Sequence, residues 1–325
     1  MSDAAVRATR EGDVARLRLE RPAALNALTV EMVDAIHSAL DDWSRLPLRA
    51  IVLDGAGDHF CAGGDVRRLR EHALAGRLGE VERFFRREYA LNARLAESPV
   101  PVVAVIDGAC LGGGWGLSMH GTFRVVTERA VLAMPETAIG FVPDVGATRI
   151  LSRLPGAIGR YLGLTGRRLD AAEAAHLGLA THVISSERKD DVADLLAAKP
   201  DETVESVLAG IPAPPLPAAA IAAEAGSIDQ VFSAGDVPGI RARLQVLDSA
   251  WAARTRDLLA VASPASLDAT LALIDDAAGR TLAECLDAEF AAAMTLVRSG
   301  EFAEGVRVRL VDRGDTPTWP SRRSG

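Results

Sequence analysis

Apolar and polar residues alternate at the start of the chain and then change to a helical spacing. The stretch VARLRL (14–19) has the period of two that a half-buried strand requires, and Arg21-Pro22 should end that strand. In TVEMVDAIHSALDDWSRL (29–46), apolar residues recur three and four positions apart, with Thr29 or a neighbour as the helix cap. AIVLDG (50–55) then indicates a buried strand, followed by a Gly-rich loop.

The same order occurs twice more along the chain. EYALNARLAESP (88–99) is typical of a helix, and residues 101–121 of a strand, a Gly-rich turn and a helix. A weaker third copy covers FRVVTERAVLAMPE (123–136) and the residues after it. Repeated strand, loop and helix units predict an α/β fold with its sites at the loops that follow strands.

Beyond about Ser186 the pattern becomes helical. IPAPPLPAAAI (211–221) interrupts it with prolines that fit neither a helix nor a central strand, and predicts a rigid connection. Residues 237–262 then read as one helical segment, and Ser263 followed by Pro264 marks another helix start. We therefore expect an α/β core over residues 1–190 and a helical region over 191–325.

Composition narrows the function classes. No apolar run approaches the ~20 residues that span a bilayer, and the first residues, MSDAAVRATREGD, lack a signal-peptide core, so a cytoplasmic protein without membrane contact is expected. The formal net charge of −8 argues against binding nucleic acid. Three distant cysteines, Cys61, Cys110 and Cys285, indicate buried thiols rather than disulfides or a metal site.

Two Gly-rich loops offer backbone N–H groups with little side-chain obstruction. They are FCAGGD (60–65) and LGGGWG (111–116). Two such loops converging on one atom would form an oxyanion hole, although each alone is also explained as a tight turn. Neither matches a nucleotide-binding fingerprint, and Ser118 lacks the surroundings of a hydrolase nucleophile, so a helix position suits it better.

Two carboxylates stand in the nearly uncharged run MPETAIGFVPDVGATRIL (134–151). Glu136 and Asp144 each follow a proline, and burial together would raise the pKa of at least one of them toward neutrality. Acidic residues after proline also cap turns and helices. The pattern alone leaves caps and catalysis equally open.

Taken together, ERPAALNALT, FCAGGD, GACLGGGWGL and MPETAIGFVPDVGAT resemble the enoyl-CoA hydratase/isomerase, or crotonase, superfamily. Within it the closer resemblance is to the 3-hydroxyisobutyryl-CoA hydrolase family, through FFRREYALN, SMHGTFRVVTE, LTGRRL, GLATHVI, SPASL and EFAEGVRVRLVDRGDTPTW. These segments extend over nearly the whole chain. The resemblance implies repeated ββα units forming two nearly perpendicular sheets, C-terminal helices that complete the site, and a homo-oligomer, either trimer or hexamer.

The resemblance also implies an acyl-CoA thioester as ligand and no separate cofactor or metal. The thioester carbonyl would lie between the N–H groups of Gly64 and Gly113. Glu88 matches a substrate-contacting glutamate of the hydrolases, although a solvated helix position among arginines explains it too. Five residues would lie along the CoA, mainly through backbone contacts: Asn26, Ala27, Ala62, Gly63 and Asp65.

One departure from the superfamily pattern selects the reaction. Hydratases of this type usually carry a glutamate where this chain has Gly116, besides the one at Glu136, and tend to have glycine where it has Asp144. The resemblance therefore implies hydrolysis of a short branched 3-hydroxyacyl-CoA, 3-hydroxyisobutyryl-CoA, in valine breakdown. Glu136 would attack the carbonyl or activate water, and Asp144 would orient water or the substrate hydroxyl, or share a proton with Glu136.

Two other functions and the role of one arginine cluster stay open at this point. The chain could be a hydratase, isomerase or other acyl-CoA enzyme of the same fold, or a CoA-binding protein without catalysis. The cluster Arg67, Arg68 and Arg70 could bind CoA phosphates or be plain surface.

Overall fold

The computed structural model describes residues 5–320, which form two compact units. The first consists of the residues up to Gly64, Arg87–Leu132 and Leu169–Ala219; the second of Asp65–Arg86, Ala133–Arg168 and the residues from Ala220 onward. Each unit is therefore assembled from segments far apart in the sequence. The predicted division at residue 190 separates two regions that are each continuous in sequence. That division stays a prediction.

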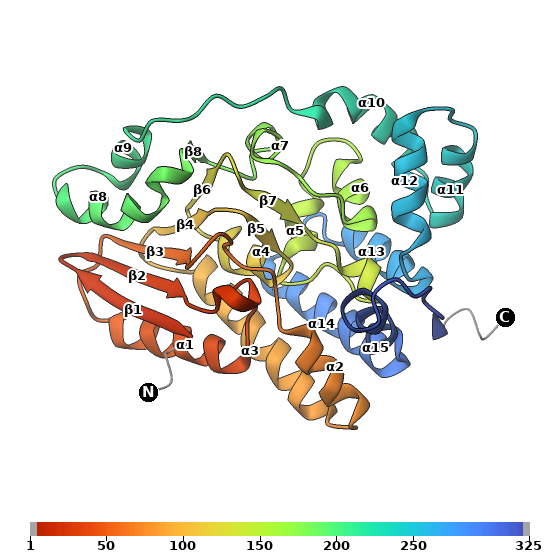
Figure 1. The fold of residues 1–325 in the computed structure, drawn as a ribbon, viewed down its shortest axis with the longest axis horizontal. Helices are drawn as coiled ribbons and strands as arrows, with labels where there is room; N and C mark the ends of the chain where they lie inside the picture. The colour runs from red at the N-terminus through yellow and green to blue at the C-terminus, as the bar shows by residue number, and fades with distance from the viewer. Residues whose placement is uncertain (1–4, 321–325) are drawn as a thin grey trace. The chain divides into compact units, whose positions relative to one another are not determined.

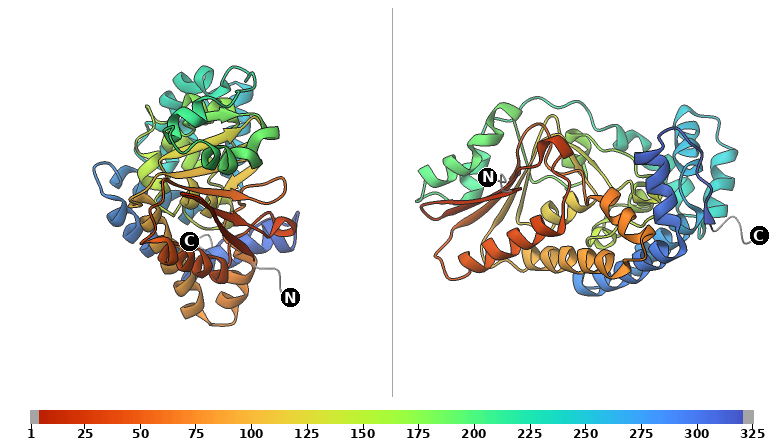
Figure 2. Two further views of the ribbon diagram at one scale, coloured as in Figure 1. Left: turned by 90° about the vertical axis from the view of Figure 1, so that its left-hand side faces the viewer. Right: turned by 60° about the horizontal axis from the view of Figure 1, so that its bottom comes forward.

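A six-stranded sheet forms the first unit, in the order β1-β2-β3-β4-β6-β8. Only β1 and β2 pair antiparallel, as the adjacent strands in Figures 1 and 2 show; all later neighbours are parallel. The strands are β1 (Val6–Glu11), β2 (Val14–Leu19), β3 (Ala50–Gly55), β4 (Val102–Ile106), β6 (Phe123–Thr127) and β8 (His182–Ile184). Parallel pairing requires long crossovers, which the intervening helices supply.

Helices cover the sheet. On one face, valines of β3 and β4 pack with apolar residues of α8 (Val192–Ala198) and α9 (Val204–Ala209). Figure 1 shows α1 (Val30–Trp43) below β1 and β2, and α8 above them. Thr29 caps α1 by accepting the N–H of Met32, as its sequence predicts. Because β4 is covered on both faces, all five of its residues are buried.

Consecutive strands after β3 alternate between two sheets. β4 is followed by β5 (Ala109–Leu111), and β6 by β7 (Val131–Ala133); β5 and β7 form a second, two-stranded sheet. A helix follows each pair, beginning with α4 (Gly113–Ser118) after β5. This is the repeated ββα order expected from the sequence, and the predicted mixed α/β fold is confirmed.

The second unit is largely helical. Around α6 pack α5, α10, α12 and α13, and Figure 1 shows α10, α11 and α12 side by side. The helices are α2 (Val66–Leu74), α5 (Ala147–Leu151), α6 (Ile158–Thr165), α10 (Ala220–Phe232), α11 (Val237–Gln245), α12 (Ala250–Ala260), α13 (Pro264–Asp276), α14 (Leu282–Ser299) and α15 (Glu301–Val306). α3 (Leu78–Ala96) begins in this unit and ends in the first; α7 (Ala171–His176) belongs to the first.

Two expectations for the helical region meet different outcomes. Ser263 caps α13 by accepting the N–H of Ser266, and Pro264 is the first helical residue, as predicted. One continuous helix over residues 237–262 is wrong: Ser249 takes an extended conformation and caps α12, which ends α11 four residues earlier. Among the described residues no single helix is long and apolar enough to cross a membrane, although α12 and α13 meet that test together as a pair bent by 110°.

Candidate functional site

Both Gly-rich loops lie in the first unit and are held side by side by backbone hydrogen bonds. Cys61 accepts the N–H of Leu111 at 2.9 Å and donates its own N–H to Ala109 at 2.9 Å. Leu28 forms an isolated bridge with Gly64 on the other flank. Gly63 (φ +96°) and Gly112 (φ +49°, ψ −119°) take conformations that side chains disfavour. The two predicted oxyanion loops are therefore neighbours.

Gly113 is closely packed, and a side chain there would displace its neighbours. A Cβ on it would overlap the carboxyl group of Glu88 and lie 3.4 Å from the backbone nitrogen of Gly64. As the first residue of α4, Gly113 has an N–H group without an acceptor inside the helix. The structure thus brings Gly64, Gly113 and Glu88 together around one small space.

Glu88 is only 2% exposed, on the buried side of α3 with Tyr89 and Asn92. Its surroundings include Gly113 rather than solvent, which excludes the alternative of a solvated helix position. A buried carboxyl group costs free energy unless it is paired or used. Its burial beside an oxyanion loop is the geometry that substrate contact would require.

The five residues predicted along the CoA have structural contacts of their own. The Asn26 side chain is fully buried, accepts the N–H of Arg21 at 2.9 Å, and donates to the carbonyls of Ala56 at 3.0 Å and His59 at 2.7 Å. Ala62 donates its N–H to Leu25, and Gly63 accepts from Leu28. The Ala27 carbonyl accepts from the Arg21 guanidinium at 2.5 Å. Asn26 therefore shapes the loop with its side chain, and contact with CoA stays a prediction for all five residues.

Asp65 is the first residue of the second unit and caps α2 by accepting the N–H of Arg68. Two of the three following arginines bind backbone carbonyls, Arg67 that of Leu310 at 2.7 Å and Arg70 that of Ala303 at 2.9 Å. Their guanidinium groups thus join α2 to the C-terminal segment. These contacts weigh against a cluster dedicated to CoA phosphates.

Glu136 lies in the second unit, at the start of the 3₁₀ helix η2 (Glu136–Ile139), and is 6% exposed. Neighbouring elements hold η2 firmly: the Thr137 hydroxyl donates to Leu164 at 3.0 Å, and its carbonyl accepts the N–H of Ser263 at 3.0 Å. The Glu136 carbonyl also accepts the N–H of Phe141 at 3.0 Å. Glu136 is therefore a buried carboxylate on a rigid turn.

Asp144 is 4% exposed and lies in the loop before α5. Its carbonyl accepts the N–H of Ala147 at 2.8 Å, and the N-cap residue of α5 is Gly146. Asp144 interacts electrostatically with a third carboxyl group, that of Glu289 in α14. Burial first, and Asp144 in addition, raise the pKa of Glu289 to about 8.

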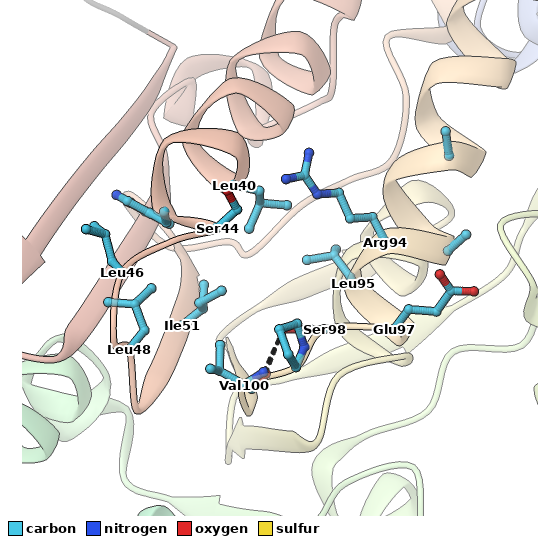
Figure 3. A pocket seen from close by; sticks show the side chains of 14 residues that line it. Leu40, Ser44, Leu46, Leu48, Ile51, Arg94, Leu95, Glu97, Ser98 and Val100 are labelled. Carbon is cyan, nitrogen blue, oxygen red and sulfur yellow. Dashed lines mark hydrogen bonds between the residues drawn. The ribbon is translucent and has the colours of Figure 1, made fainter.

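A large apolar cavity lies elsewhere, in the first unit. It holds about 470 Å³ between the C-terminal ends of α1 and α3 (Figure 3). Leu40, Leu46, Leu48 and Ile51 line it, and Arg94 at its edge already pairs with Asp41 at 2.7 Å. None of the predicted site residues lines it, so this apolar cavity is not the candidate site.

Comparison with known proteins agrees with these features. The family model described as enoyl-CoA hydratase/isomerase matches residues 14–324. The chain belongs to the enoyl-CoA hydratase/isomerase family. This confirms the resemblance read from the Gly-rich loops and from MPETAIGFVPDVGAT.

Relatives within the enoyl-CoA hydratase/isomerase family match over almost the full chain. The mitochondrial 3-hydroxyisobutyryl-CoA hydrolase of Danio rerio is 38% identical, over 97% of this chain and 85% of its own. The enzyme of that name from Homo sapiens is also 38% identical, over 95% and 82%. The closer resemblance to the hydrolases is therefore confirmed at the level of sequence.

Solved structures of this family have the same fold. A carnitinyl-CoA dehydratase from Mycobacterium thermoresistibile superposes with a TM-score of 0.92 at 36% identity, covering 99% of this chain and 93% of that chain. An enoyl-CoA hydratase from Rhodobacter sphaeroides gives 0.90 at 35%, covering 97% and 92%. Fold and family alone thus leave hydrolase and hydratase chemistry to be separated by the site residues.

Glu289 and Thr148 were missed in the sequence. They are 141 residues apart, so no local motif joins them. A signal was nevertheless present: Glu289 lies four residues after Cys285 and four before Ala293, in the apolar stripe of α14. An acidic residue in such a stripe means either that the apolar face of the helix has been assigned wrongly or that the carboxyl group is buried and hydrogen-bonded.

Proposed function

We propose that this protein hydrolyses the thioester of 3-hydroxyisobutyryl-CoA to 3-hydroxyisobutyrate and CoA. The observation that carries the proposal is the pair of buried carboxylates Glu136 and Asp144, in a chain that has Gly116 where hydratases carry an acid. The sequence identity to enzymes named as 3-hydroxyisobutyryl-CoA hydrolases supports it.

In this proposal the thioester oxygen accepts the N–H groups of Gly64 and Gly113. Negative charge collects on that oxygen as the tetrahedral intermediate forms, so these donors stabilise the transition state more than the substrate. The adjacency of the two Gly-rich loops supports this role. The CoA would lie along the backbone of Asn26, Ala27, Ala62, Gly63 and Asp65.

Glu136 would act in one of two ways, as a nucleophile or as a general base. As nucleophile it attacks the carbonyl, expels CoA as thiolate and forms a mixed anhydride, which water cleaves to regenerate the carboxylate. As general base it takes a proton from water, whose oxygen attacks the carbonyl directly, and the proton passes to the leaving thiolate. A single turnover in ¹⁸O-water separates them: only the nucleophilic route leaves the first label partly on Glu136.

Glu88 supplies the preference for a hydroxylated acyl group. Its carboxyl group is buried beside Gly113, where it would accept a hydrogen bond from the 3-hydroxyl. An acyl chain without that hydroxyl would forgo this hydrogen bond and bind less tightly. Asp144 would orient the attacking water or the same hydroxyl.

The second candidate is a hydratase or dehydratase of acyl-CoA. It is favoured by the similarity to a carnitinyl-CoA dehydratase and an enoyl-CoA hydratase, which share 35–36% identity with this chain. The glycine at position 116 opposes it, because the usual second acid is missing. A CoA-binding protein without catalysis predicts instead that Glu136→Gln and Asp144→Asn change no activity.

One assay separates these functions. The protein is incubated with 3-hydroxyisobutyryl-CoA, and free thiol and unsaturated acyl-CoA are measured in the same sample. Hydrolysis releases CoA without forming an alkene, whereas a dehydratase forms the alkene and releases no thiol. The same proposal includes a role in valine breakdown, reaction without a cofactor and a homo-oligomeric state. It also includes a cytoplasmic location, whereas the relatives from Danio rerio and Homo sapiens are named as mitochondrial.

A further inference from the structure

Glu289 is a buried residue of the second unit, and nothing in the proposed reaction uses it. Its side chain has no exposed surface, and it stands on α14 among Cys285, Leu286 and Ala293, which are all buried. A carboxyl group in such surroundings persists only if hydrogen bonds compensate for the lost water.

All the donors that Glu289 binds come from one short loop. Its Oε2 accepts the backbone N–H of Gly146 at 2.7 Å. Its Oε1 accepts the backbone N–H of Thr148 at 3.0 Å and the Thr148 hydroxyl at 2.5 Å. Three hydrogen bonds from a single carboxyl group therefore fix the backbone directly after Asp144.

That backbone is strained. Val145 has φ +54° and Gly146 φ +80°, so two consecutive residues lie in the left-handed region. A β-branched residue avoids this region because its side chain crowds the backbone. Such a conformation persists where the surroundings determine it, and strain of this kind gathers at functional sites. Here the neighbour of the strained residue is the buried Asp144.

We propose that Glu289 is a positioning residue for thioester hydrolysis: its carboxyl group holds the strained loop 144–148 and thereby fixes the orientation of Asp144. The proposal rests on the proposed function for its effect on rate. Its effect on the loop is independent of any activity.

The first test replaces Glu289 by glutamine, which keeps the side-chain volume. An amide presents one oxygen and one NH₂ group, so it can serve Thr148 or Gly146 but not both. We expect kcat per folded enzyme to fall about 10- to 100-fold, with KM nearly unchanged, because one of the loop donors then loses its acceptor. Asp287→Asn is the matched control, an exposed carboxylate on the same helix, and should keep wild-type kcat.

The second test uses a matched pair at Thr148. Thr148→Val removes the hydroxyl donor and keeps the shape, and we expect an intermediate loss of kcat. Thr148→Ser restores the hydroxyl and should recover most of it. Because this pair leaves Glu289 in place, it tests the proposal even if Glu289→Gln fails to fold.

Hydrogen–deuterium exchange provides the readout that does not depend on activity. In Glu289→Gln the amides of residues 145–148 should exchange at least about tenfold faster, whereas those of α6 should not change. Wild-type exchange and wild-type kcat in the folded variant would overturn the inference. If the wild type itself releases no CoA, the proposed function fails, and the exchange result still decides whether Glu289 holds the loop.

Discussion

Gly113 and Glu88 occupy adjoining space: a methyl group on Gly113 would overlap the Glu88 carboxyl group. The backbone of one proposed oxyanion donor and the side chain proposed to bind the acyl hydroxyl are thus in direct contact. A side chain added at Gly113 would therefore displace the Glu88 carboxyl group. This contact gives the first prediction.

Gly113→Ala should reduce hydrolysis mainly by displacing Glu88. The cost in folding free energy should be about 1–3 kcal/mol, typical of overpacking. Combining it with Glu88→Ala should recover stability, because the overlapping carboxyl group is then absent, but should not recover activity. Chemical denaturation of the two single variants and the double variant measures this; strictly additive losses of stability would contradict it.

Glu88→Gln should change specificity more than stability. We expect kcat/KM for 3-hydroxyisobutyryl-CoA to fall about 10- to 100-fold, because the 3-hydroxyl would then donate to a neutral amide oxygen instead of a carboxylate. Activity on isobutyryl-CoA, which lacks the hydroxyl, should change little. Glu80→Gln is the control, an exposed glutamate on the same helix. Equal losses on both substrates would remove hydroxyl recognition from the role of Glu88.

Asn26→Ala should lower stability rather than affinity for CoA. Its buried amide makes three hydrogen bonds, to Arg21, Ala56 and His59, and their loss should cost about 2–4 kcal/mol. Thermal unfolding tests this against Gln245→Ala, which removes an exposed amide. A stable variant with a strongly raised KM would show instead that the Asn26 side chain binds CoA.

Stability should also depend on pH through Glu289. Its pKa is raised to about 8 in the folded protein, above the ordinary 4.5. Between these values the folded state keeps a proton that the unfolded state releases. The contribution of Glu289 is therefore complete below about pH 4.5 and is lost as the pH rises through 8.

As the pH rises from 4.5 to about 8, the free energy of unfolding of the wild type should therefore fall relative to that of Glu289→Gln, by up to about 1.4 kcal/mol per pH unit. Denaturation of both proteins across pH 5–9 measures the difference. Parallel stability curves would mean that Glu289 is ionised throughout.

Features encoded by neighbouring residues were predictable from the sequence. The strand at Val14–Leu19, the Thr29 cap and the start of α13 at Ser263-Pro264 each depend on a few adjacent positions. The break between α11 and α12 was missed, since one serine decides it against a favourable helical pattern on both sides. Local signals thus predict where elements exist better than where they stop.

The site divides in the same way. Glycine loops and paired carboxylates are visible as short motifs, so Glu136 and Asp144, and through the family resemblance Gly64 and Gly113, could be proposed as site candidates in advance. Glu289 could not, because its partners lie 141 and 143 residues earlier. The burial of Glu88 likewise depends on packing against Gly113, 25 positions away in the chain.

The central claim is that Glu136 drives release of CoA from a 3-hydroxyacyl thioester. The most direct measurement compares free thiol released from 3-hydroxyisobutyryl-CoA by wild type and by Glu136→Gln, at equal concentrations of folded protein. We predict steady thiol release by wild type, a loss of at least about 10²-fold in the variant, and no unsaturated acyl-CoA from either. Formation of the alkene by wild type without thiol, or equal thiol release by both proteins, would contradict the account.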